Sequence, residues 1–137
     1  KIQIFNKGKM RRDFTFIDDI TEGIFRCCFK PASYQEKSLH KNLSAPYRIF
    51  NIGNGKPINL MDFVNLLEKE LNQEAKKVFL NMQKGDVVET WASTLNLQNW
   101  IDYKPETELE RGIKEFVSWY KDYYKVFSPE EHKVDNK

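Results

Sequence analysis

Residues 8–20 read GKMRRDFTFIDDI, and this stretch changes from a strand pattern to a helix pattern within a few residues. The run 12–17 is rich in residues that favour extended backbone, which predicts a hairpin arm or a short extended segment. Asp18 or Asp19 then stands where a cap begins a helix that continues to about Lys30, with apolar residues at helical spacing. The stretch alone therefore predicts that strands and helices together build this fold.

Outward from this stretch, short extended segments alternate with amphipathic helices. Strands are predicted at 2–5, 47–52 and 77–80, a turn at 83–86, and helices at 60–72, 94–100 and 108–125. Asn59 and Ser93 are polar residues of the kind that cap the helices that follow them. The expected fold class is α/β, with a few short strands and about four helices.

The predicted strands are too few and too scattered to form a convincing sheet alone, and the edges of such a sheet need a cover. We therefore expect the sequence to be a fragment of a longer protein. Residues 1–127 are expected to form one folded portion. Residues 128–137 are charged and interrupted by Pro129, so we expect them to be a disordered tail.

Composition excludes several classes of function. The chain has 137 residues with 22 basic and 20 acidic side chains, and its net charge of +2 gives no basic patch for nucleic acid or a membrane surface. No run of about eighteen apolar residues is present, so no membrane span is expected. Cys27 and Cys28 are adjacent, which suits neither a disulfide framework nor a metal site, and predicts reduced thiols in a cytoplasmic protein.

Two motifs that suggest chemistry are explained better by structure. Consecutive helical residues point about 100° apart, so Asp18 and Asp19 would not converge on one ion, and a cap beside a solvated neighbour is favoured. The stretch 53–55 reads Gly-Asn-Gly between a predicted strand and a predicted helix, as in a dinucleotide fingerprint. The third glycine is replaced by Ile58, so a plain turn is favoured.

Three polar residues remain as candidates for ligand binding. Arg12 lies inside a β-forming run, where a planar guanidinium could bind a phosphate through two hydrogen bonds. Gln83 and Asp86 place an amide and a carboxylate on one turn, where they could hold ligand hydroxyl groups. Solvation at the surface is the alternative for each of them, because most surface charges bind nothing.

Three segments, in order, resemble the NAD-dependent nucleotide-sugar epimerases, which are extended short-chain dehydrogenase/reductases. Residues 8–20 resemble the family's G-x-x-x-R-D-F-x-Y-I-D-D-I, residues 47–54 (YRIFNIGN) its Y-x-x-Y-N-I-G-N, and residues 83–90 (QKGDVVET) its Q-P-G-D-V-x-x-T. The branch that the chain resembles most is UDP-glucuronate 4-epimerase, through GKMRRDFT at 8–15 and SAPYR at 44–48. The resemblance extends from Lys1 to about Val126.

The resemblance implies that the chain is the C-terminal, substrate-binding portion of such an enzyme, with part of its Rossmann-like fold. The family's N-terminal part supplies the glycine-rich NAD turn and the catalytic Tyr-x-x-x-Lys, and this chain has no tyrosine with lysine four residues later. We therefore expect no catalytic, cofactor-binding or metal-binding residue here, with NAD held by the missing part. By the same resemblance, Arg12 binds the UDP diphosphate and Asp86 a ribose hydroxyl, and Gln83 takes the place of a phosphate-binding arginine.

The whole protein is accordingly expected to be a cytoplasmic epimerase of a UDP-sugar in polysaccharide biosynthesis, and this chain alone is expected to be inactive. A homo-oligomer, or association with the missing N-terminal half, is expected because exposed strand residues need a cover. A nucleotide-sugar dehydratase or decarboxylase of the same superfamily is one alternative. A non-catalytic nucleotide-sugar-binding module is another.

Overall fold

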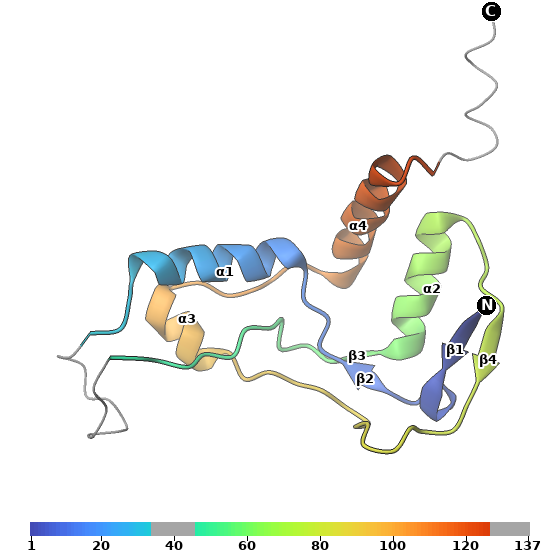
Figure 1. Ribbon diagram of the computed structural model, residues 1–137, viewed down its shortest axis with the longest axis horizontal. Helices are drawn as coiled ribbons and strands as arrows, with labels where there is room; N and C mark the ends of the chain where they lie inside the picture. The colour runs from blue at the N-terminus through green and yellow to red at the C-terminus, as the bar shows by residue number, and fades with distance from the viewer. Residues whose placement is uncertain (34–45, 127–137) are drawn as a thin grey trace, which may run out of the picture.

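The computed structural model describes residues 1–33 and 46–126, and within them short strands alternate with four α-helices (Figure 1). The elements in chain order are β1 (Ile2–Ile4), the 3₁₀ helix η1 (Phe5–Gly8), β2 (Arg11–Arg12), α1 (Ile17–Phe29), β3 (Ile58–Asn59), α2 (Leu60–Leu71), β4 (Lys77–Phe79), α3 (Leu95–Ile101) and α4 (Leu109–Tyr123). The expected α/β class is confirmed. The expected tail at 128–137 lies outside the described residues.

The strands form two separate pairs rather than one sheet. β1 and β4 pair in parallel with Ile2 opposite Lys77, and β2 and β3 pair antiparallel with Arg11 opposite Asn59. The chain reverses between β1 and β2 through η1, where Gly8 has φ +79° and lies close against the side chain of Met61. A Cβ at this position would be strained by the backbone angle and would crowd that side chain.

The helices pack in two groups. α2 lies against α4 near the β1–β4 pair, and α1 lies against α3 at the other end of the molecule (Figure 1). The buried hydrophobic side chains include Val64 of α2 together with Ile113 and Val117 of α4. The segment between β2 and α1 adds Phe14, whose ring stacks on Phe63 of α2 with centroids 4.3 Å apart. The predicted periodicity of these two long helices is confirmed.

The strand predicted at 47–52 was wrong because strand pairing depends on a distant partner. Residues 46–52 belong to neither sheet, although a strand was predicted at 47–52. A strand exists only when a neighbouring strand completes its hydrogen bonds. Here the segment packs through side chains instead, with Phe50 stacked on Trp100 of α3 and Ile52 against Gly23 of α1.

The predicted helix caps were also partly wrong. α1 begins at Ile17 after Phe16, so Asp18 and Asp19 lie inside its first turn and neither is the cap. Asn59 does precede α2, yet its side-chain amide donates to the Asp62 carboxylate rather than capping the backbone. Thr94, and not Ser93, precedes α3.

Candidate functional site

The segment 10–19 connects most of the described fold, because successive residues bind different distant segments. The Met10 carbonyl accepts from Leu60 N at the start of α2, and Thr15 Oγ1 accepts from Asn54 N. Phe16 packs on Gly112 of α4, whose missing side chain leaves room for its ring. The stretch that changes from strand to helix pattern in the sequence is therefore where the two helix groups are joined.

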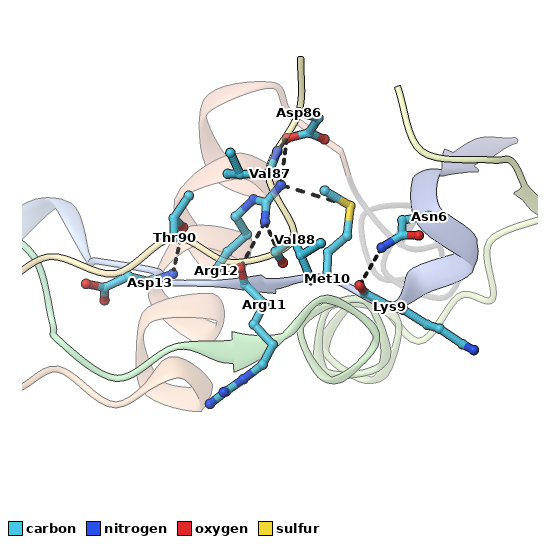
Figure 2. Close-up of polar contacts among 10 residues, drawn as sticks. All are labelled: Asn6, Lys9, Met10, Arg11, Arg12, Asp13, Asp86, Val87, Val88 and Thr90. Carbon is cyan, nitrogen blue, oxygen red and sulfur yellow. Dashed lines mark hydrogen bonds and ion pairs between the residues drawn. The ribbon is translucent and has the colours of Figure 1, made fainter. Parts of the chain in front are cut away.

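Arg12 is the residue of this segment whose charged group has the most contacts (Figure 2). Its Nη1 donates to the carbonyls of Arg11 at 2.9 Å and Val88 at 3.2 Å, and its Nη2 forms an ion pair with Asp86 Oδ1 at 2.9 Å. Nη2 also lies 4.0 Å from the sulfur of Met10. The Arg12 side chain is 22% exposed, so it is partly buried and still reached by solvent.

Asp86 reaches Arg12 from the turn predicted at 83–86. Asp86 N donates to the carbonyl of Gln83, and Gly85 takes φ +84°, which confirms the turn. The Asp86 side chain also bonds to its own backbone segment, since Oδ1 accepts from Val87 N at 2.8 Å. The structure thus brings Arg12 and Asp86 together, and it places Gln83, an exposed residue, at the start of the same turn.

The neighbouring Arg11 has a different role. Its side chain points away from Arg12 (Figure 2), and it pairs with Glu89 at 3.1 Å and donates to the Pro57 carbonyl at 3.0 Å. It is 49% exposed, more than twice as much as Arg12. Of the two adjacent arginines, Arg12 is therefore the one that is oriented by a partly buried carboxylate.

The Gly-Asn-Gly turn at 53–55 does not fit a dinucleotide phosphate. Gly55 N donates to both carboxylate oxygens of Asp13 at 3.0 Å, and Ala92 N donates to one of them at 3.1 Å. A Cβ on Gly53 would lie 2.9 Å from the same carboxylate. The amide that such a turn would offer to a phosphate is therefore bound by an aspartate of the same chain, which favours the structural interpretation of this turn.

Asp19 is a structural residue that the sequence did not reveal. It is buried, and its carboxylate accepts from Thr107 N at 2.9 Å, from Thr107 Oγ1 at 3.0 Å and from the Tyr103 hydroxyl at 3.1 Å. Asp19 is therefore neither of the two alternatives predicted for this pair, a helix cap or a solvated neighbour. The second carboxylate, Asp18, is exposed. No spacing rule indicates partners about 84–88 residues away, so only the fold could identify them.

Burial, together with the hydrogen bond to Asp19, raises the pKa of Tyr103 from its ordinary 10.0 to about 12. Because the folded state holds this proton more tightly, the contribution to stability is complete below pH 10 and is lost as pH rises toward 12. Tyr103→Phe should therefore flatten the decline of the free energy of unfolding between pH 10 and 12, as measured by urea titration at each pH. An identical decline in the two proteins would contradict this assignment.

The described residues form an apolar cavity, but neither a metal-binding cluster nor a membrane-spanning helix. An apolar hollow of about 370 Å³ lies between α1, residues 50–52 and α3, and its wall includes Cys27 and Cys28. Within residues 1–33 and 46–126, no group of three or more histidine, cysteine or carboxylate side chains is placed to hold a metal ion. None of the helices in the same ranges combines the length and the hydrophobicity needed to cross a membrane.

Comparison with known proteins places these features in a class. No family model matches the chain. The chain is 44% identical over 129 residues to protein CapI of Staphylococcus aureus and 38% identical over 130 residues to a probable UDP-glucuronate 4-epimerase of Rhizobium meliloti. Each match includes 90% of this chain but only 39% and 38%, respectively, of the relative. The chain therefore spans well under half the length of these relatives.

Solved structures give the same result. The fold matches the UDP-glucuronic acid 4-epimerase of Bacillus cereus, solved with UDP-glucuronic acid and NAD, with a TM-score of 0.70 and 27% identity. That match covers 90% of this chain and 36% of the other. The chain thus matches part of the NAD-dependent nucleotide-sugar epimerases of the extended short-chain dehydrogenase/reductase superfamily. Within that class, it matches part of the UDP-glucuronate 4-epimerase family.

Proposed function

We propose that this chain is the C-terminal, UDP-sugar-binding portion of a cytoplasmic NAD-dependent epimerase that acts on UDP-glucuronate. The observation that carries the proposal is the contact between Arg12 and Asp86, which are 74 residues apart in sequence and 2.9 Å apart in space. The family resemblance assigns the first to a diphosphate and the second to a ribose hydroxyl. The diphosphate and the ribose of one nucleotide are neighbours, so the residues that bind them must also be neighbours. Arg12 and Asp86 meet this requirement.

In this proposal the chain contributes binding and orientation. Arg12 donates hydrogen bonds to phosphate oxygens, Asp86 accepts from ribose, and Gln83 offers an amide from the same turn. Binding energy from the nucleotide, which does not react, fixes the position of the sugar for the reaction. NAD, bound by the rest of the protein, supplies the acceptor and donor of hydride. This chain's own glycine turn is closed by Asp13 and takes no part in binding NAD.

The distribution of apolar residues supports the proposal that a further part of the protein covers one face. Phe25 and Phe29 of α1 are 60% and 75% exposed, and Ile49 is 82% exposed on the neighbouring segment. Phe25 and Phe29 belong to α1, which lies with α3 at one end of the molecule (Figure 1). Large exposed apolar patches mark interfaces. We infer that the remainder of the full-length protein, or a second copy, packs there.

The decisive experiment is an assay of the full-length protein with UDP-glucuronate and NAD, with the product identified by NMR. The expected product is UDP-galacturonate, with inverted configuration at C4 and no net consumption of NAD. A product that has lost water or carbon dioxide would instead identify a dehydratase or decarboxylase. UDP-glucuronate binding without any conversion would identify a binding module and contradict the epimerase.

A further inference from the structure

The Arg12 guanidinium already uses most of its hydrogen-bonding capacity inside the protein. Both protons of Nη1 are directed to carbonyl oxygens, those of Arg11 and Val88, and Nη2 donates to Asp86 and contacts the sulfur of Met10. Among the described residues, no acceptor binds Nε. A phosphate that takes two donors from one side of a guanidinium uses Nε together with the neighbouring Nη2. Nη2 is also the nitrogen that donates to the Asp86 carboxylate.

A diphosphate and Asp86 therefore compete for the same nitrogen. The ion pair is 22% exposed on Arg12 and 30% exposed on Asp86, so solvent weakens it and a more highly charged anion can replace the carboxylate. Nη1 stays bound to its two carbonyls meanwhile, which keeps the guanidinium in position during the exchange. Asp86 also keeps its hydrogen bond from Val87 N, so its carboxylate stays beside the site when Arg12 leaves it.

We propose that the Arg12–Asp86 ion pair is a latch that the ligand's diphosphate opens. The phosphate replaces the carboxylate on Nη2, and the released carboxylate becomes available to a ligand hydroxyl. This inference rests on the proposed function and deepens it, because it sets an order in which phosphate recognition precedes hydroxyl recognition. It also makes Asp86 a residue that restrains anion binding at Arg12 until an anion of sufficient charge arrives.

The test is calorimetric titration of the full-length protein with inorganic pyrophosphate at physiological salt. Asp86→Asn keeps the shape of the side chain and removes the competing charge, so it should tighten pyrophosphate binding by about tenfold. Glu89→Gln is the matched control, since it removes the same charge from the same segment beside Arg11 instead. Because Glu89 pairs with Arg11 and its carboxylate is exposed, the control should change the affinity by less than about twofold.

A purely structural ion pair predicts the opposite pattern. In that case Asp86→Asn lowers the melting temperature and leaves pyrophosphate affinity unchanged or weaker, which overturns the latch. If the variant does not fold, a crystal structure of the wild-type protein with pyrophosphate decides. The latch requires the Arg12 Nη2–Asp86 Oδ1 contact to be broken there. Persistence of the 2.9 Å contact with the anion bound overturns it.

A parallel titration of the wild-type protein with UDP distinguishes failure of the latch from failure of the proposed function. Binding of UDP without a gain in Asp86→Asn overturns the latch and leaves the proposed function standing. Failure of the wild-type protein to bind UDP overturns the proposed function, and the latch fails with it.

Discussion

Arg12→Lys in the full-length protein should raise the dissociation constant of UDP by about tenfold or more. Lysine keeps the positive charge but loses the planar set of donors that binds two phosphate oxygens at once. Hydrogen bonds to charged groups contribute about 1.5–3 kcal/mol each, and 1.4 kcal/mol corresponds to a factor of ten in affinity. Calorimetric titration with UDP measures the change, and the NAD content of the purified protein should be unaltered.

The adjacent arginine provides the control for this experiment. Arg11→Lys makes the same change one residue away, on a side chain that points away from Arg12 and pairs with Glu89 (Figure 2). Its UDP affinity should equal that of the wild-type protein. If Arg12 only steadies the turn through Asp86, Arg12→Lys will lower the melting temperature and leave the affinity within about twofold of wild type. That result would show that Arg12 does not bind UDP.

Asp13→Ala should lower the free energy of unfolding by about 3 kcal/mol or more. The substitution leaves the N–H groups of Gly55 and Ala92 without the carboxylate that accepts from both. Each lost hydrogen bond to a charged acceptor costs about 1.5–3 kcal/mol, and unpaired donors that are partly buried recover little of this from water. Urea unfolding monitored by circular dichroism measures the difference.

Two further variants calibrate this measurement. Asp18→Ala removes an exposed aspartate from the first turn of α1, where the favourable charge–dipole interaction is worth about 0.3–1 kcal/mol, so its effect should be small. Asp13→Asn keeps one acceptor oxygen and should fall between Asp13→Ala and the wild-type protein. A loss below about 1 kcal/mol for Asp13→Ala would show that the carboxylate does not hold these segments together.

The sequence predicted those parts of the fold that depend on neighbours along the chain. The helices α2 and α4 follow from apolar residues at helical spacing. Their bounds, Leu60–Leu71 and Leu109–Tyr123, differ from the predicted 60–72 and 108–125 by no more than two residues at any end. The turn at 83–86 follows from Gly85, which supplies a positive φ. These elements need no information from distant residues.

Elements that depend on a distant partner could not be predicted in the same way. The strand predicted at 47–52 has the right composition, but strand pairing depends on a partner strand that composition does not specify. Asp19 has the local features of a cap, and its actual partners, Tyr103 and Thr107, are more than 80 residues away.

The same limit applies to the candidate site. Arg12 and Asp86 were each predicted to contact a ligand, and their contact with each other needed the structure, because nothing in the spacing of 74 residues indicates it. The exposed position of Gln83 agrees with the turn predicted at 83–86, because turn residues lie at the surface.

The segment 10–19 also has a consequence for biosynthesis. Its partners are made late, since Asp19 is joined to Thr107 by a hydrogen bond that spans 88 residues of sequence. At a translation rate of about 5–20 residues per second, the ribosome needs about 4–18 s to progress from one to the other. Phe16 waits longer still, because it packs on Gly112 of α4, which follows Thr107 in the chain. Part of the segment that ties the mature fold together therefore remains without its partners until α4 is being made.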